Sequence, residues 1–172
     1  MQKKEIERKY LIRYPELDSL VGQCSHVYTI EQTYLLSRPG VTQRVRRRSE
    51  GEKTEYFYTE KERISGMTAL EREREISQEE YRHLLGRRDP PLQTIQKTRY
   101  CLPCRNHLFE IDVYYFWRKI ATMEVELDSE GETFDIPPKC HIIKDVTDDY
   151  SFKNASLARN APDENSINRL LS

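Results

Sequence analysis

The chain has 172 residues, of which 33% are charged, and its 28 Lys and Arg nearly balance its 29 Asp and Glu. This length fits one domain over residues 1–172, and the balanced charge argues against a general nucleic-acid binder. Without an apolar leader or the roughly 20 apolar residues that span a bilayer, the chain is expected to be cytoplasmic, monomeric or homodimeric, and bound to no membrane.

The first predicted strand contains Glu5, Glu7 and Lys9 at alternate positions. Because successive side chains of a strand point to opposite faces, two carboxylates and an ammonium share one face. One such pattern is typical of a solvated edge strand. Here, however, nearly every later strand also carries two charged residues at alternate positions, on one face.

Many short strands and few helices are predicted along the rest of the chain. The expected strands cover residues 29–36, 41–48, 53–61, 70–76, 94–102, 108–116 and 121–128, with a short one around 142–143. Short helices are expected at 15–21, 77–86, 155–158 and 163–171. The Glu/Arg run at 70–76 would also suit a helix, but the capping box from Ser77 to Glu80 places the helix start after it.

The charged faces of these strands are segregated by sign. Acids dominate the strands of Glu5, Glu71, Glu110 and Glu124, and bases dominate those of Arg44, Lys61 and Lys97. This predicts opposed walls around an enclosed space, as in a closed antiparallel barrel of about eight strands with helices packed outside and at the C-terminus. Unpaired buried charges cost several kcal/mol each, so the space must be wet and hold a ligand of both signs. A polyphosphate with a divalent metal meets that need.

These residues resemble the triphosphate tunnel metalloenzymes, or CYTH superfamily. The similarity rests on seven motifs in order: Glu5-x-Glu7-x-Lys9, Arg44-x-Arg46, Thr59-x-Lys61, Glu71-x-Glu73, Lys97-Thr98-Arg99-Tyr100, Glu110-x-Asp112 and Glu124-Val125-Glu126. It extends from about residue 5 to about residue 158. We expect Glu5, Arg44, Lys61, Glu73, Arg99, Asp112 and Glu126 to point into one solvent-filled tunnel.

The resemblance implies hydrolysis of inorganic triphosphate to pyrophosphate and phosphate with Mg²⁺ or Mn²⁺. Glu5, Glu7, Glu124 and Glu126 are then the expected metal ligands, and Lys9, Arg44, Arg46, Lys61, Lys97 and Arg99 the expected phosphate contacts. Glu71, Glu73 or Asp112 would hold a second metal that positions the attacking water. Class IV adenylyl cyclase and thiamine triphosphatase activities share this scaffold, and a non-catalytic polyphosphate-binding module is a further alternative.

Two departures from the family pattern affect these expectations. Ala69 stands where similar sequences often carry arginine before the Glu71 motif, so one phosphate contact is expected either to be lost or to be supplied by Arg72 or Arg74. Tyr150 and Ser151 also stand in places that are often basic in similar sequences, which argues against phosphate binding at that end of the tunnel. Because the named inward positions include few aromatics, a bare triphosphate is predicted to be preferred over a nucleotide or thiamine triphosphate.

Overall fold

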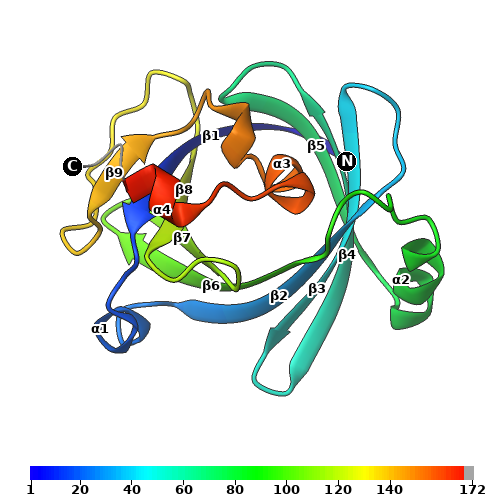
Figure 1. Ribbon diagram of the computed structural model, residues 1–172, viewed down its shortest axis with the longest axis horizontal. Coiled ribbons are helices and arrows are strands. Elements are labelled where there is room, and N and C mark those ends of the chain that lie inside the picture. Colours follow the sequence, from blue (N-terminus) through cyan, green and yellow to red (C-terminus); the bar gives the residue numbers. More distant parts are fainter. Residues whose placement is uncertain (169–172) are drawn as a thin grey trace.

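The computed structural model describes residues 1–168, which form a closed antiparallel barrel of eight strands with a ninth strand added at its edge (Figure 1). The strands are β1 (Gln2–Arg13), β2 (His26–Leu35), β3 (Val41–Glu50), β4 (Lys53–Arg63), β5 (Thr68–Ile76), β6 (Ile95–Cys104), β7 (His107–Tyr114), β8 (Ile120–Leu127) and β9 (Ile142–Asp145). Their order is β5-β4-β3-β2-β6-β7-β8-β1, and the pairing of β1 with β5 closes the ring.

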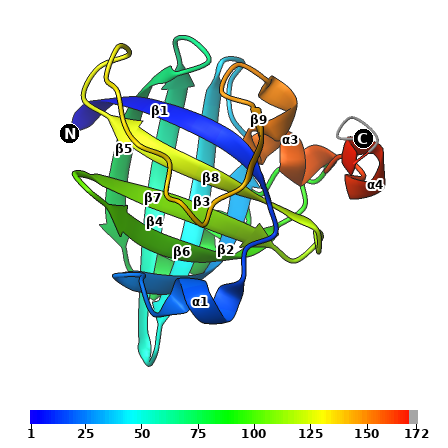
Figure 2. The same ribbon diagram turned by 90° about the vertical axis from the view of Figure 1, so that its left-hand side faces the viewer.

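Strand β1 is the closing element because it changes partner along one edge. Residues Gln2–Ile6 pair with β5, and Tyr10–Ile12 pair with β9, while the other edge pairs with β8 from Ile6 to Arg13 (Figure 2). With β5, β8 and β9 as successive partners, β1 is paired along its whole length on at least one edge, so no long stretch of this strand is left without a neighbour.

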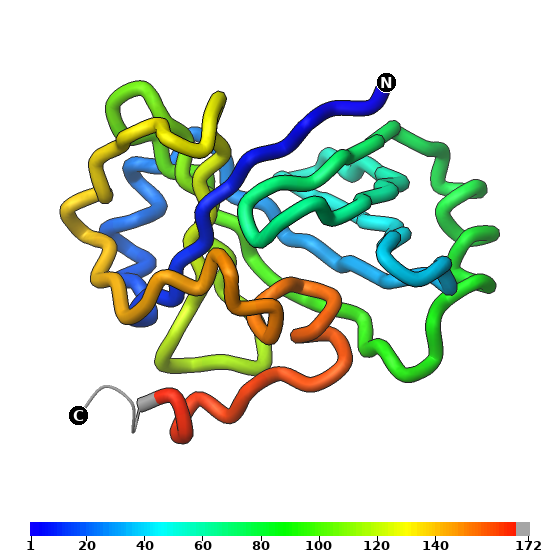
Figure 3. Tube along the Cα trace, turned by 90° about the horizontal axis from the view of Figure 1, so that it is seen from above, coloured from blue at the N-terminus to red at the C-terminus, as the bar shows by residue number. Residues whose placement is uncertain are grey.

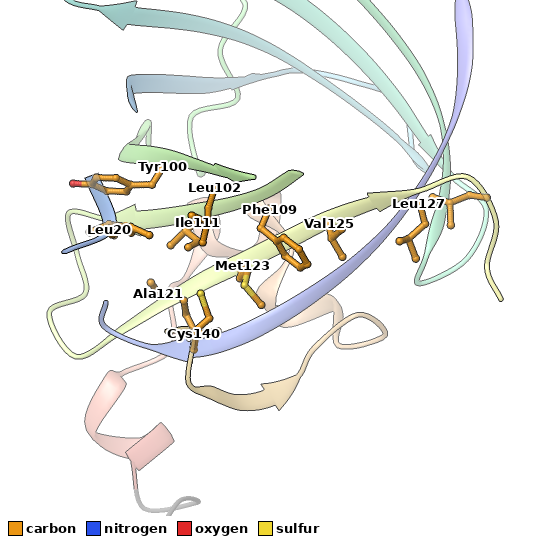
Figure 4. Close-up of a cluster of buried hydrophobic side chains, with 13 residues drawn as sticks. Leu20, Tyr100, Leu102, Phe109, Ile111, Ala121, Met123, Val125, Leu127 and Cys140 are labelled. Carbon is orange, nitrogen blue, oxygen red and sulfur yellow. The ribbon is translucent and has the colours of Figure 1, made fainter. Parts of the chain in front are cut away.

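The apolar face of the strands lies on the outside of the barrel. One cluster covers the outer face of β1, β6, β7 and β8 and includes Phe109, Ile111, Met123 and Val125 (Figure 4). Helix α1 (Leu17–Val21) and the segment 128–141 cover it, the latter through Phe134, Ile136 and Cys140. The polar face must consequently point inward.

Helix α2 (Gln78–Leu85) packs against the opposite outer face. Its Tyr81 and Leu84 contact a cluster that includes Leu35, Val45 and Ile76. The helix begins where the capping box predicts, because the Ser77 hydroxyl accepts a hydrogen bond from the Glu80 backbone N–H at 3.0 Å.

The C-terminal segment lies across one end of the barrel instead of packing outside it (Figures 1 and 3). It contains a 3₁₀ turn (Tyr150–Phe152), α3 (Asn154–Arg159) and α4 (Glu164–Asn168). Its apolar residues Phe152, Leu157 and Ala158 join inward residues such as Leu11 and Tyr34 in a second core. We call this the α3 end of the barrel.

The predicted elements are confirmed, with boundary shifts. The largest shift is in β2, which begins at His26 and not at Thr29, and so adds His26 and Tyr28 to the strand. The expected helix at 163–171 is present as α4 up to Asn168, and its residues 169–171 lie outside the described residues. Among residues 1–168, no helix has the length and apolar character needed to cross a bilayer.

Truncating the outer core should destabilise the fold. Met123 is fully buried among the residues of Figure 4, so Met123→Ala is expected to lower the free energy of unfolding by about 2–5 kcal/mol through the cavity it leaves. Urea denaturation measures the change. Leu36→Ala is the matched control, because Leu36 is 55% exposed and should change stability little. Equal losses in the two variants would contradict the assignment of this face as core.

Candidate active site

The barrel encloses a cavity of about 920 Å³ that is lined largely by charged side chains. Nine acidic residues and nine Lys or Arg residues line it. They come from seven of the eight barrel strands, from the loop after β8 and from Lys153 in front of α3. In each strand they occupy alternate positions, so the period-two pattern of the sequence places them all on the inner face.

The four expected metal ligands all line the cavity, on adjacent strands. Glu5 and Glu7 lie on β1 and Glu124 and Glu126 on β8, with Glu7 directly opposite Glu126. In the structure, amines neutralise three of them. Lys61 lies 2.5 Å from Glu5 and Lys9 lies 2.7 Å from Glu124, and Lys3 pairs with Glu126.

Of these four carboxylates, Glu7 is the most weakly neutralised. Burial, and then the charge of nearby Glu124, raise its pKa above the ordinary value, and its closest amine is Lys153 at 3.9 Å. No cluster of three or more potential metal ligands converges in residues 1–168 as they stand. The donor chemistry nevertheless fits a divalent cation, since Glu7 and Glu124 repel each other across a site rich in carboxylate oxygens.

The arginines of β3 form the opposite wall. In the eight-membered ring β3 lies four strands from β8, across the cavity from the carboxylates (Figure 1). Arg44 Nε is buried without a hydrogen-bond acceptor, and Arg44 Nη2 lies 3.9 Å from Glu71. Arg46 donates only to the neutral Gln32 Oε1, at 3.3 and 3.2 Å. Burial, together with Arg44 and Arg99, lowers the pKa of Arg46 to about 9.

The β3 wall therefore carries positive charge that the protein itself does not neutralise. A buried guanidinium with a free donor is costly unless an anion meets it. Phosphate oxygens suit these donors well, because they accept charge-assisted, bidentate hydrogen bonds.

Lys61, Glu71 and Glu73 lie beside the arginines on β4 and β5. Lys61 is directly opposite Glu71, with Lys61 Nζ at 3.3 Å from Glu71 Oε2. Although burial opposes it, Lys61 and Arg44 lower the pKa of Glu71, yet its Oε2 accepts no hydrogen bond. Glu73 accepts a hydrogen bond from the Thr59 hydroxyl at 2.8 Å. Both carboxylates retain acceptor capacity toward the cavity.

Lys97 and Asp112 do not line the cavity, contrary to expectation. Both are fully buried, and Asp112 accepts hydrogen bonds from Lys97 Nζ at 2.5 Å and from Arg99 Nε and Nη2 at 2.7 and 2.8 Å. Despite burial, Arg99 and Lys97 lower the pKa of Asp112 to about 2, and burial lowers that of Lys97 to about 7. Asp112 thus anchors Arg99, which does line the cavity, and its surroundings disfavour a role in holding a second metal.

The expected segregation into walls is only part of the arrangement. Acids and bases also face each other directly on neighbouring strands, as in the pairs Lys9 with Glu124 and Lys61 with Glu71. Opposite charges at cross-strand positions stabilise a sheet, and here they also limit the cost of burial.

Several cavity residues were not predicted. His26 and Tyr28 were missed because β2 starts earlier than its β-branched run indicates, and Tyr28 stacks on His26 under the Arg48 guanidinium. Lys153 was missed because the tail lacks a strand pattern, although the adjacent Lys153-Asn154 pair was a signal that could have found it.

The expectation for Arg72 and Arg74 was wrong. Arg72 donates to Gln2 on the surface, and Arg74 pairs with Glu80, so both point out of the barrel. The inward neighbour of Ala69 is instead Arg63 on β4, which lines the cavity.

Comparison with known proteins gives the family. The chain is 33% identical over 166 residues to the inorganic triphosphatase of Nitrosomonas europaea, covering 92% of this chain and 99% of that protein. A crystal structure of an inorganic triphosphatase matches with 30% identity and a TM-score of 0.56, over 92% of this chain and 97% of that one. A protein from Pyrococcus horikoshii shares the fold at 19% identity and a TM-score of 0.57, over 73% of this chain and 80% of that one. No family model matches.

The length of the match, at this identity, settles the class. The chain belongs to the CYTH-type triphosphatase family, as the motif resemblance implied.

Removing the buried Asp112 charge should destabilise the protein. Asp112→Asn leaves Lys97 and Arg99 uncompensated, so we expect a loss of about 3–5 kcal/mol in the free energy of unfolding. The Asp112 pKa is depressed, so in the unmodified chain this contribution is present above the ordinary value of 3.8 and is lost as pH falls through about 2.

Chemical denaturation at pH 7 and pH 4 measures this loss, which should be similar at both values. Glu73→Gln is the control, because its carboxylate faces the cavity and should change stability by less than about 1 kcal/mol. A stable Asp112→Asn variant with lost activity would instead support a direct role in the reaction.

Proposed function

We propose that this protein hydrolyses inorganic triphosphate to pyrophosphate and phosphate inside the barrel, with Mg²⁺ or Mn²⁺. The observation that carries the proposal is the β3 wall, where Arg44 Nε has no acceptor and Arg46 donates only to an amide. Carboxylates stand across the cavity from it. A relative named as an inorganic triphosphatase supports the same substrate.

On binding, basic side chains that pair with glutamates in the structure would pair with phosphate oxygens of the substrate. Arg44 and Arg46 would hold phosphate oxygens. Lys9 and Lys61 would turn from Glu124 and Glu5 toward the substrate as those carboxylates take up metal, and Arg99 would contact the substrate from its place beside Asp112. Asp112, itself bonded to Lys97, would keep Arg99 in position from behind the cavity wall. This preorganised set of donors stabilises the charge of the transition state without reorganisation of solvent.

Glu5, Glu7, Glu124 and Glu126 would hold the metal, which when bound would neutralise negative charge on the triphosphate. Glu71 and Glu73 have free acceptor capacity and would orient the attacking water. The water oxygen bonds to the terminal phosphorus, the bond from that phosphorus to the bridging oxygen breaks, and pyrophosphate leaves. The proton of the water passes to an acceptor such as Glu71 or to solvent.

Other activities on this scaffold remain as competing proposals. A protein from Hippeastrum, described as a putative adenylyl cyclase with a dominant triphosphatase activity, shares the fold at 14% identity and a TM-score of 0.56, over 73% of this chain and 80% of that one. At this identity the likeness concerns the fold alone. A polyphosphate-binding module without catalysis would explain the arginines but not the many carboxylates. We further propose a cytoplasmic location, which the four free thiols support, and a monomeric or homodimeric state.

Catalysis should require a divalent metal and the ionised carboxylates that hold it. We expect no phosphate release in excess chelator and full recovery with added Mg²⁺ or Mn²⁺. Activity should fall at acid pH, and because the Glu7 pKa is raised, the fall should begin above the range of an ordinary glutamate.

The matched variants are Glu7→Gln and Glu60→Gln. Glu7→Gln should lower turnover by orders of magnitude with the fold intact, and Glu60→Gln, which changes an outward-facing carboxylate bonded to Gln43, should not. Undiminished turnover in chelator would disprove the metal requirement.

Tripolyphosphate should be the preferred substrate. The ring of Tyr28 is already engaged by His26 and by Arg48 at 4.5 Å, and Tyr34 is buried. Of the tyrosines that line the cavity, this leaves Tyr150 at the α3 end as the exposed ring, which is little stacking surface for a nucleobase. Pyrophosphate should be poor, because each lost charge-assisted hydrogen bond costs about 1.5–3 kcal/mol.

Phosphate release from tripolyphosphate, ATP, thiamine triphosphate and pyrophosphate measures kcat/KM for each, with a cyclic-nucleotide assay alongside. A larger kcat/KM for ATP or thiamine triphosphate, or cyclic AMP as the main product, would favour an alternative activity. Tight binding of tripolyphosphate without turnover would indicate the binding module.

A further inference from the structure

At the α3 end of the cavity, two cations share one backbone acceptor. The carbonyl oxygen of Gly66, in the loop between β4 and β5, accepts hydrogen bonds from Arg63 Nη1 at 3.3 Å and from Lys153 Nζ at 2.9 Å. Both side chains line the cavity. They come from elements far apart in sequence, so only the tertiary fold brings them together.

Arg63 lacks the carboxylate partner that most other bases of the cavity have, and Lys153 has a distant one. Within residues 1–168, no Asp or Glu oxygen lies within 4.0 Å of Arg63, and the nearest to Lys153 is Glu7 at 3.9 Å. Burial, and then the charge of Arg63, lower the pKa of Lys153 to about 8. A neutral carbonyl satisfies hydrogen bonds but leaves the charge uncompensated.

The loop that carries Gly66 is held firmly against its neighbours. A Cβ on Gly66 would lie 1.8 Å from Asp148 Oδ1, so the loop packs directly on that side chain. The next residue, Met67, accepts a hydrogen bond from the Glu7 backbone N–H at 3.0 Å. The two cations are thus presented by a fixed support and not by a free surface loop.

Arg63 also stands directly beside an inward position that has no charge. Ala69 pairs with Arg63 on β4 and with Glu5 on β1, and it is completely buried. Arg63 lies four residues along β4 from Thr59, the partner of Arg44, which is about 13 Å of strand. It is therefore separate from the β3 wall and closer to α3.

We propose that Arg63 and Lys153 form an anion subsite at the α3 end that binds a terminal phosphate group of the triphosphate, with Arg63 supplying from β4 the positive charge that Ala69 lacks on β5. The proposal rests on the proposed function, because it assigns one end of the same substrate. Since α3 covers this end of the barrel, the subsite takes a chain end and favours a substrate long enough to reach both it and the β3 wall.

The test separates charge from fold by three variants of Arg63. Arg63→Gln keeps a donor for Gly66 but removes the charge, so KM for tripolyphosphate should rise about tenfold or more, with a smaller change in kcat. Arg63→Lys keeps the charge and should retain most of the affinity. Arg63→Gln with Ala69→Arg moves the charge across the strand pair and should recover most of the KM. Arg72→Gln, an outward change on β5, is the control and should match the unmodified chain.

Titration calorimetry of tripolyphosphate without metal gives a second readout, in which Arg63→Gln should weaken binding by the same factor. Melting temperatures show that each variant is folded, and Arg63→Lys decides the charge requirement if the double variant does not fold. A KM for Arg63→Gln within twofold of the unmodified chain, a folded double variant no better than Arg63→Gln, or an Arg63→Lys variant as impaired as Arg63→Gln, overturns the proposal. If the unmodified chain releases no phosphate from tripolyphosphate, the proposed function fails, and the calorimetric comparison still tests the subsite.

Discussion

Ionised side chains inside a β-barrel lose most of their hydration, and the cost of several kcal/mol per ion is met only by close pairing with opposite charge. This requirement accounts for the cross-strand pairs of the interior, such as Lys9 with Glu124 and the fully buried Lys97 with Asp112. Side chains of the interior that stay unpaired mark where a ligand of opposite charge is expected to bind. Here the excess positive charge is concentrated on Arg44 and Arg46 of β3, with a second, smaller excess at Arg63 and Lys153.

The same requirement reverses the usual distribution of apolar residues in a small β domain. Because charged side chains line most of the interior, hydrophobic burial comes from the outer face and from the α3 end, and the fold supplies a separate cover for each. Helix α1 with the segment 128–141 covers one side, α2 covers another, and the C-terminal segment seals one end. Stability therefore depends on these covering elements as well as on the strands of the barrel.

The interior residues fall into two groups with different roles. Asp112 and Lys97 lie beneath the cavity surface and fix Arg99, whereas Arg44, Arg46 and the glutamates of β1 and β8 face the open space. Motif membership does not separate the groups, since Lys97 and Arg99 belong to one motif. What separates them is whether the side chain lines the cavity, as Arg99 does and Lys97 does not. The same holds at Ala69, where the nearest inward cation comes from a different strand.

Much of this architecture was predictable from the sequence by itself. Period-two charge alternation predicted the strands and the shared face of Glu5, Glu7 and Lys9, and the capping box at Ser77 separated a strand from the helix that follows it. The order of seven charged motifs predicted the barrel and the family. These features are local, or depend only on spacing along the chain, so one sequence is sufficient to determine them.

Only the tertiary structure decided how far each charged residue lies from solvent and which partner it meets. Strand alternation defines two faces but not their depth, so Asp112 and Glu110 looked equivalent in sequence, although Asp112 is fully buried and Glu110 lines the cavity. The register of the β4–β5 hairpin placed Arg63 beside Ala69. Arg72 and Arg74 point outward because they alternate with the inward Glu71 and Glu73, as strand alternation alone requires. Lys153 reaches the cavity because the tail folds across the barrel end, a contact over 87 residues of sequence that no local pattern encodes.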